Sequence, residues 1–346
     1  MATAFHPLRV AAADQLTDDS LAITFDVPGE LRDTFRFLPG QHLTLRRIVE
    51  GEDLRRTYSV CASALTGPLR VAVKRLDGGV VSGWLVDELK AGDVLEVLPP
   101  AGSFGPRSPD KRRYGLIAAG SGITPMVSIA ATALETGSEV VLLYGNRTTR
   151  DVMFLEELAD LKDRFPASFQ LLHVLSREEQ ESELLTGRLD RDRLTRILQV
   201  LVPVDSIDAW YLCGPFDMVN AAREVLAEQG ATDVHVELFH ADAPPPRPPR
   251  PPAEAGETSV SALLNGRITT FSMNRDDKVL DALLAVRADA PYACRGGVCG
   301  TCRARVVVGQ VEMETNYALE PEELKAGVVL TCQAHPLDDE LRLEFL

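Results

Sequence analysis

The chain has 346 residues, enough for two or three domains, and its 45% hydrophobic and 25% charged residues are typical of water-soluble globular proteins. No stretch approaches the roughly 20 apolar residues that a membrane-spanning helix needs. We see no signal peptide and expect a cytoplasmic protein. The net charge of −15 argues against nucleic acid or an anionic membrane as partner. It suits docking to a basic patch on another protein, or solubility alone.

Residues 1–108 are predicted to form an all-β barrel. Short apolar runs at 21–25, 42–45 and 69–73 are separated by Pro-Gly and Asp-Gly turn signals. Several short strands joined by tight turns are typical of a small barrel.

Residues 109–241 are predicted to form a doubly wound α/β domain. Four apolar runs are typical of buried parallel strands, and three stretches between them are typical of helices. The strands are predicted at 114–118, 139–144, 169–175 and 209–212, and the helices at 124–135, 154–164 and 218–228. Alternation of buried strands and helices indicates a parallel sheet covered on both faces.

A proline-rich run separates this domain from the last one. The run from Pro244 to Pro252 favours the extended polyproline II conformation and would act as a semi-rigid spacer. We therefore assign 242–253 to a linker. Residues 254–346 mix short strands with one helix near 279–288, which predicts an α+β module of the β-grasp type.

Four cysteines in the last domain predict an iron–sulfur cluster. Cys294, Cys299 and Cys302 read C-x4-C-x2-C, and Cys332 follows the apolar run 328–331. This is the spacing of plant-type [2Fe-2S] ferredoxins, in which four thiolates ligate two irons.

The loop that holds the first three cysteines also contains Gly296, Gly297 and Gly300. Glycine tolerates the positive φ that a tight loop around a cluster demands. The alternatives are a structural zinc site and disulfide bonds. Zinc sites more often use two separated cysteine pairs. Crowded cysteines in a cytoplasmic protein more often bind metal or act in catalysis than form disulfides.

Two motifs in the α/β domain indicate a nucleotide site. Gly120 and Gly122 lie between a predicted strand and a predicted helix. Glycine there lets the backbone approach a pyrophosphate, and the helix N-terminus favours its charge. Cys213 ends a later strand, and the carboxyl ends of such strands line one crevice. Alone, a Gly-x-Gly is a weak signal, and Cys213 could be a small core residue.

The barrel domain carries the motif Arg56-Thr-Tyr58-Ser59. Together with the glycine motifs and the cysteines, it makes the chain resemble the ferredoxin–NADP reductase superfamily over nearly its full length. The resemblance implies that Arg56 pairs with the flavin phosphate, that Tyr58 stacks on the isoalloxazine ring, and that Ser59 hydrogen-bonds near its N5 atom. Arginine suits phosphate, and an aromatic face suits a planar ring.

The resemblance implies further cofactor contacts. Val73 and Lys74 would run along the flavin, and Val81 and Ser82 would lie in a pyrophosphate-binding turn, which favours FAD over the FMN of a minority of relatives. The other implied contacts with nicotinamide or flavin are Gly120, Gly122, Thr124, Pro125, Cys213, Gly214, Glu237 and Phe239. Ser59, Cys213 and Glu237 are the catalytic candidates, and no side-chain general base is expected. Phe239 could instead be a core residue of an edge strand.

Ser176 and Arg177 follow the strand predicted at 169–175. They resemble the segment that holds the 2′-phosphate of NADPH in the superfamily, and a hydroxyl and a guanidinium suit a dianionic phosphate. Arg147 would add a second cation. NADH enzymes more often place an acidic residue at the ribose. The superfamily's adenine-stacking tyrosine is not found shortly after this segment, so NADH stays the alternative to the NADPH that we predict.

These parts predict one electron path from NADPH through FAD and a [2Fe-2S] cluster to an external acceptor. The domain order resembles the reductase components of multicomponent oxygenases, and residues 309–320 resemble those that serve a diiron oxygenase. The enzymatic alternative is the reductase component of a Rieske-type hydroxylase, for which NADH could be the electron donor. A pure electron carrier or an iron–sulfur sensor with vestigial flavin motifs is the non-enzymatic one, and flavin in the purified protein would exclude it.

Overall fold

The structure, a computed structural model, describes residues 4–107, 112–239 and 257–346. The described residues form two compact units. One lies within 6–52 and 58–239, and the other gathers 257–346 with the short segments 4–5 and 53–57. The predicted linker 242–253 and all three predicted domain boundaries fall outside the described residues, so the boundaries stay predictions.

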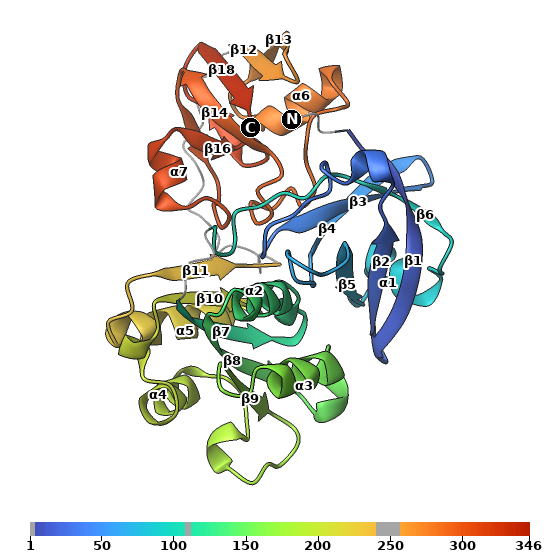
Figure 1. Cartoon of the computed structure of the whole chain (residues 1–346). Helices are drawn as coiled ribbons and strands as arrows, with labels where there is room; N and C mark the ends of the chain where they lie inside the picture. Colours follow the sequence, from blue (N-terminus) through green and yellow to red (C-terminus); the bar gives the residue numbers. More distant parts are fainter. Residues whose placement is uncertain (1–3, 108–111, 240–256) are drawn as a thin grey trace. The chain divides into compact units, whose positions relative to one another are not determined.

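The first sheet is antiparallel, with strand order β4-β3-β6-β1-β2-β5. Its strands are β1 (His6–Thr17), β2 (Ser20–Asp26), β3 (His42–Val49), β4 (Glu52–Ser59), β5 (Arg70–Lys74) and β6 (Val94–Val97). An antiparallel bridge between Val60 and Val71 joins the chain after β4 to β5. The two ends of the sheet therefore meet and close the predicted barrel (Figure 1).

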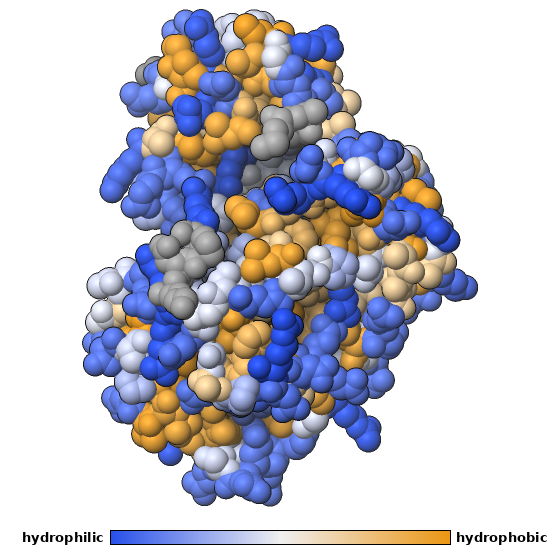
Figure 2. All heavy atoms as spheres, viewed as in Figure 1, coloured by the Kyte–Doolittle hydropathy of each residue, from blue (hydrophilic) through white to orange (hydrophobic). Residues whose placement is uncertain are grey.

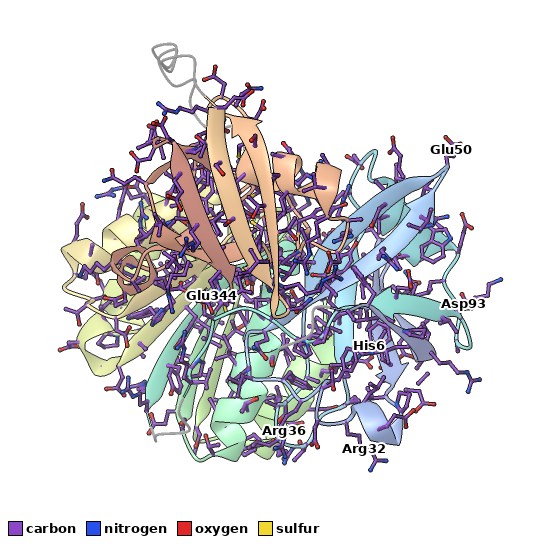
Figure 3. The ribbon with its side chains drawn as sticks, turned by 90° about the horizontal axis from the view of Figure 1, so that it is seen from above. His6, Arg32, Arg36, Glu50, Asp93 and Glu344 are labelled. Carbon is purple, nitrogen blue, oxygen red and sulfur yellow. The ribbon has the colours of Figure 1, made fainter. Side chains whose placement is uncertain are left out.

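Turns set the ends of the barrel strands. Glu50, at φ +51°, lies at the tip of the hairpin between β3 and β4 (Figure 3). A short 3-10 turn, η1 (Gly29–Leu31), follows β2, and helix α1 (Val80–Asp87) follows β5. Inside the barrel, alternate residues such as Leu8 and Val10 of β1 are fully buried, as a half-buried strand requires.

The second sheet is parallel, with order β11-β10-β7-β8-β9. Its strands are β7 (Arg113–Ala119), β8 (Glu139–Asn146), β9 (Phe169–Leu175), β10 (Ala209–Cys213) and β11 (Val234–Glu237). The chain leaves β7 toward β8 and later returns to β10 on the other side of β7. The carboxyl ends of β7 and β10 thus flank the switch point, where open α/β sheets bind ligands.

Helices cover both faces of this sheet, as predicted. α2 (Ile123–Glu135) and α3 (Leu155–Arg164) lie on one face, and α4 (Arg191–Val200) and α5 (Phe216–Glu228) lie on the other (Figure 1). The 3-10 turns are η2 (Gly120–Gly122), η3 (Thr149–Asp151), η4 (Glu183–Leu185) and η5 (Val204–Ser206). One hydrophobic core joins residues of this domain, such as Met126 and Tyr211, to the barrel residues Ala22, Cys61 and Ala72.

The third sheet is mixed, with order β13-β12-β18-β14-β16, beside a two-stranded ribbon of β15 and β17. The elements are β12 (Glu257–Leu264), β13 (Arg267–Asn274), α6 (Val279–Val286), β14 (Arg303–Val308), β15 (Val311–Met313), α7 (Pro321–Lys325), β16 (Val328–Leu330), β17 (Ala334–Pro336) and β18 (Glu340–Phe345). β12 and β18 run parallel, and α6 packs Leu280 and Leu283 into the core beside Cys302 and Cys332.

The predicted fold class is confirmed for all three parts of the chain: a barrel, a doubly wound sheet and a β-grasp module. Hydrophilic side chains predominate on the face shown in Figure 2, with apolar residues in separate patches. Among the described residues, none of the helices has the length and apolar character needed to cross a bilayer.

Candidate functional site

The four cysteines come together as two pairs. The thiols of Cys294 and Cys299 share a hydrogen bond, as do those of Cys302 and Cys332. Each bond lowers the pKa of one partner, Cys294 in the first pair and Cys332 in the second. In the described residues, no group of three or more His, Cys, Asp or Glu side chains converges on one ion. Two pairs fit a centre with two irons, whereas a mononuclear zinc site needs its ligands around one ion.

The surroundings of the thiols fit thiolate ligands. The backbone N–H groups of Gly296 and Cys299 each lie 3.4 Å from the Cys294 sulfur. The Thr301 hydroxyl lies 3.2 Å from the Cys299 sulfur. Donors directed at sulfur stabilise the deprotonated ligands that a [2Fe-2S] cluster requires.

The loop conformation differs from the predicted one at one residue. Gly297 and Gly300 have φ of +76° and +66°, as expected of glycines in a curled loop. Gly296 does not adopt positive φ; its neighbour Arg295 does, at +54°. A side chain at Gly297 would come within 2.9 Å of the Thr315 hydroxyl, whereas one at Gly296 has only an ordinary contact at 3.8 Å. Close packing therefore makes glycine necessary at 297 and not at 296.

The predicted flavin motif lies along the end of β4. Arg56 is exposed, and its guanidinium donates to the carbonyl of Arg55 at 2.8 Å, which leaves further N–H groups for an anion. Tyr58 is half-buried, and Ser59 is buried. A cation at the surface and a hydroxyl inside fit a ligand whose phosphate is solvated and whose ring is enclosed.

The two other flavin segments are the end of β5 and the start of α1. Val73 is fully buried, and Lys74 forms an ion pair with Asp19 at 3.0 Å. The Ser82 hydroxyl donates to the carbonyl of Gly79 at 3.4 Å. Because its hydroxyl is used within this turn, the first backbone N–H groups of α1, which include that of Val81, are the donors that suit a phosphate here.

The two nucleotide motifs meet at the switch point. Gly122 packs so closely on the end of β10 that a Cβ there would lie 2.2 Å from the carbonyl oxygen of Cys213. Thr124 is buried and donates to the carbonyl of Ser121 at 3.1 Å, and Pro125 lies in the first turn of α2. Gly214, with φ +158°, directly follows Cys213.

The three catalytic candidates lie together. The Ser59 hydroxyl donates to a carboxylate oxygen of Glu237 at 3.3 Å. Cys213 and Glu237 are register partners on β10 and β11. Burial raises the pKa of Glu237 to about 8, although the Ser59 hydrogen bond opposes it. Burial, followed by the charge of Glu237, raises the pKa of Cys213 well above its usual value. Cys213 is thus a neutral thiol, not an activated nucleophile.

Phe239 follows β11, the edge strand next to β10. It is partly buried and packs against the hydrophobic core shared by the barrel and the α/β domain. This position is compatible with both predicted roles, an edge-strand core residue and a cover for the flavin ring.

A pocket of about 460 Å³ opens at the carboxyl ends of the parallel strands. It is lined by Gly120, Ser176 and three arginines, Arg147, Arg188 and Arg191, and also by Asp151, Asp190 and Asp217. Arg191 is already paired with Glu224 and Glu228, so Arg147 and Arg188 are the arginines that suit a ligand phosphate. Arg177 is exposed and does not line the pocket. Its backbone N–H is instead bound to the carbonyl of Arg147 at 2.8 Å.

The pocket fits a pyridine nucleotide in two further ways. The Nδ2 atom of Asn146, which lines it, is buried and has no hydrogen-bond partner among the described residues. Such an orphaned donor costs free energy unless a ligand or water accepts from it. Arginine side chains around glycine backbone are the donor set that a phosphorylated ligand requires.

Comparisons with known proteins agree with this site. An oxidoreductase FAD-binding domain matches residues 7–105, an oxidoreductase NAD-binding domain matches 116–224, and a 2Fe-2S iron–sulfur cluster binding domain matches 262–337. The chain is 44% identical to one of the subunits of 1,2-phenylacetyl-CoA epoxidase from Escherichia coli K12, over 99% of this chain and 98% of the relative. The chain belongs to the ferredoxin–NADP reductase superfamily.

Other members of the superfamily match over comparable lengths. The ferredoxin reductase component of 3-ketosteroid-9-alpha-monooxygenase from Rhodococcus rhodochrous is 38% identical, over 98% of this chain and 96% of the relative. The structure of phthalate dioxygenase reductase superposes with a TM-score of 0.61, covering 99% and 98% of the two chains. At 23% identity it supports the fold alone. The predicted oxidoreductase class, and the prediction of FAD, a pyridine nucleotide and a [2Fe-2S] cluster, are confirmed for this superfamily member.

Sequence reasoning missed Arg188 and Arg191 of the pocket. Arg188 precedes the N-cap of α4, where Asp190 accepts from the backbone N–H of Arg193 at 3.0 Å. The signal was a Gly-Arg pair before an Asp cap and the spacing of Leu194 and Ile197, which would have placed a helix there. Because α4 was not predicted, the positions of Arg188 and Arg191 near the end of β9 could not be predicted either.

Proposed function

We propose that this protein is the NADPH-dependent reductase of a multicomponent oxygenase, and that its acceptor is the diiron enzyme that epoxidises phenylacetyl-CoA. The observation that carries the proposal is the 44% identity to a component of such an epoxidase along nearly the whole of both chains. The proposal places the protein in phenylacetate catabolism. The boundaries at 108, 241 and 253 and a cytoplasmic location belong to it as predictions.

Each site has a proposed role. A bound FAD takes two electrons from a nicotinamide and releases them singly, as a one-electron cluster requires. Arg56 and the start of α1 bind the flavin phosphates, and Tyr58 contacts the ring. Ser59 and Glu237 hold a proton at the ring edge. Cys213 orients the nicotinamide there without attacking it.

The cluster residues have the last role in the proposed path. Cys294 and Cys299 bind one iron, and Cys302 and Cys332 bind the other, since each pair already shares a hydrogen bond. The thiols of Cys302 and Cys332 are buried in the domain core, so the exposed side of the loop is the exit for the electron.

NADPH is the proposed donor because arginines line the pocket beyond the ends of β8 and β9, alongside Asp151 and Asp190. Arg147, Arg188 and Ser176 line it, and a 2′-phosphate would satisfy their donors. We expect Arg188→Ala to lower kcat/KM for NADPH at least tenfold, mainly through KM, and to change NADH turnover little. Arg177→Ala is the matched control and should have a smaller effect. Equal losses with both nucleotides in Arg188→Ala would contradict the assignment.

The acceptor is tested by isolating the protein with its partner from the native host. We expect the co-purified oxygenase to form an epoxide from phenylacetyl-CoA when NADPH is supplied, and to form none when the reductase is omitted. The second candidate is a Rieske-type steroid hydroxylase, supported by the 38% identity to the 3-ketosteroid-9-alpha-monooxygenase component. Co-purification and turnover of such a hydroxylase would replace the first proposal with the second.

A further inference from the structure

Gln333 is a buried polar residue directly beside a predicted cluster ligand. Its side chain is only 3% exposed. The Nε2 atom lies 2.8 Å from the carbonyl oxygen of Arg295, 2.9 Å from the carbonyl oxygen of Cys332 and 3.5 Å from the Cys332 sulfur. The Gln333 side chain therefore contacts both the cluster loop, at Arg295, and the sulfur of Cys332, the one predicted ligand that lies outside that loop in the sequence.

The orientation of this amide follows from its partners. Two of them are carbonyl oxygens, which can only accept, so the group that faces them must be the NH₂ group. At the other end of the amide, the Thr315 hydroxyl donates to Oε1 at 2.7 Å. The NH₂ group has two N–H bonds. One serves Arg295, and the other is shared between the carbonyl and the sulfur of Cys332.

The backbone holds the same three segments together. The N–H of Glu314 donates to the carbonyl of Gln333 at 2.9 Å, and the N–H of Tyr317 donates to the carbonyl of Gly297 at 3.0 Å. The segment 314–317 is thus fixed against the cluster loop on one side and against the chain after Cys332 on the other. Thr315 lies within it, so its hydroxyl has a fixed place beside Gln333.

We propose that Gln333 is a positioning residue that orients the Cys332 sulfur and raises the reduction potential of the cluster, with Thr315 fixing its amide. The proposal rests on ligation of the cluster by the four cysteines. On reduction a [2Fe-2S] cluster gains one electron, and part of the added charge lies on its sulfur ligands. An N–H directed at such a sulfur stabilises the reduced form more than the oxidised form, so it raises the potential. The donor makes the cluster a better acceptor from the flavin.

The test uses the full chain with its cofactors. Gln333→Met keeps a similar length and volume and removes both N–H donors. Thr315→Val removes the hydroxyl that fixes the amide, and Thr315→Ser, which keeps it, is the matched control. The midpoint potential of the cluster is measured by a redox titration followed by EPR, with iron and acid-labile sulfide determined for each variant.

We expect Gln333→Met to lower the midpoint potential and to shift the EPR g-values at full iron content. Thr315→Val should lower the potential by less, and Thr315→Ser should match the wild type. An unchanged potential in Gln333→Met at full iron content would overturn the proposal. If Gln333→Met does not retain its cluster, Thr315→Val decides: a lowered potential supports the proposal, and an unchanged one overturns it. Absence of iron and sulfide from the wild type would contradict the proposed cluster site itself.

Discussion

Glu237 has an unusual environment for a carboxyl group. Its side chain is half-buried, its carboxyl group accepts a hydrogen bond from the neutral Ser59 hydroxyl, and the loss of solvent around the carboxyl raises its pKa to about 8. A carboxyl group that is still protonated near neutral pH can hold a proton at the flavin edge while Cys213, its register partner, remains a thiol.

The raised pKa predicts how stability depends on pH. Between pH 4.5 and about 8 the folded protein holds the Glu237 proton and the unfolded chain does not, so the unfolding free energy falls as pH rises. One such proton contributes about 1.4 kcal/mol per pH unit. Glu237→Gln removes this contribution, so its melting temperature relative to the wild type should rise from pH 5 to pH 8 and level off above that.

Ser59→Ala provides the comparison for this prediction. It keeps the buried carboxyl group and removes the hydrogen bond that lowers its pKa. Its loss of stability with pH should therefore continue to a higher pH than in the wild type. A difference in melting temperature between Glu237→Gln and the wild type that stays constant over pH 5–8 would show that Glu237 is ionised when folded.

The cluster loop gives a second prediction at the scale of single residues. Gly297→Ala should reduce cluster content severely, because position 297 has φ +76° and its Cβ would press on Thr315. Gly296→Ala is the matched control and should retain the cluster, since φ there is not positive and space is available. Iron content and visible absorbance of the purified variants measure both. Equal retention in the two variants would refute this account of the loop.

Residue types with one dominant chemistry could be assigned from sequence, and others could not. Four crowded cysteines predicted a cluster site, and the structure brings them together. Positive φ was expected of the loop glycines, and Gly297 and Gly300 adopt it, but in place of Gly296 its neighbour Arg295 does. Arg147 was predicted, but Arg188 and Arg191 were missed, because the sequence around an arginine does not indicate which group it will contact in the folded protein.

At the scale of elements, the contact between α2 and β10 holds the two nucleotide motifs together. We expect Gly122→Ala to destabilise the protein by about 1–3 kcal/mol, the usual cost of overpacking, because its Cβ would overlap the Cys213 carbonyl. Turnover of NADPH by the Gly122→Ala variant should also fall, because the turn before α2 would move away from Cys213.

Gly83→Ala is the opposite case for the same substitution. Gly83 lies inside α1, and no atom lies within 4 Å of the position of an added Cβ. Removing a helix-interior glycine should raise stability by up to about 1 kcal/mol. Thermal unfolding of both variants with bound FAD measures the pair. A stable Gly122→Ala protein with normal turnover would argue against the close contact.

Strand and helix positions were largely predictable because buried parallel strands are strongly apolar. β9 has the predicted bounds, and β7, β8 and β10 differ from them by one or two residues at the ends. α4 was missed although its signal was present: Leu194, Ile197 and Leu198 have the spacing of one helix face, and Asp190 caps its N-terminus. The pocket collects the ends of the parallel strands β7, β8, β9 and β10 together with Lys74 at the end of β5, so no local pattern could reveal its lining.

At the scale of the whole molecule, the order of domains supports the function that the 44% identity to an epoxidase component carries. Barrel and α/β domain share one core, which fits a fixed flavin–nicotinamide site. The cluster domain has its own core, built from α6, β14, β16 and β18. The sequence predicted these three modules, but it contains only indirect information about the acceptor. A docking surface is complementary to one particular partner and follows no general sequence pattern.

The central claim is that electrons pass from NADPH through a flavin to the cluster within this one chain. Anaerobic titration of the purified protein with NADPH, followed by absorbance and EPR, tests it most directly. The account predicts bound FAD, bleaching of the flavin on addition of NADPH, and the EPR signal of a reduced [2Fe-2S] cluster. That signal should be lost in Cys332→Ser while flavin bleaching remains. A protein without flavin, or one whose flavin bleaches while a fully loaded cluster gives no EPR signal, would contradict it.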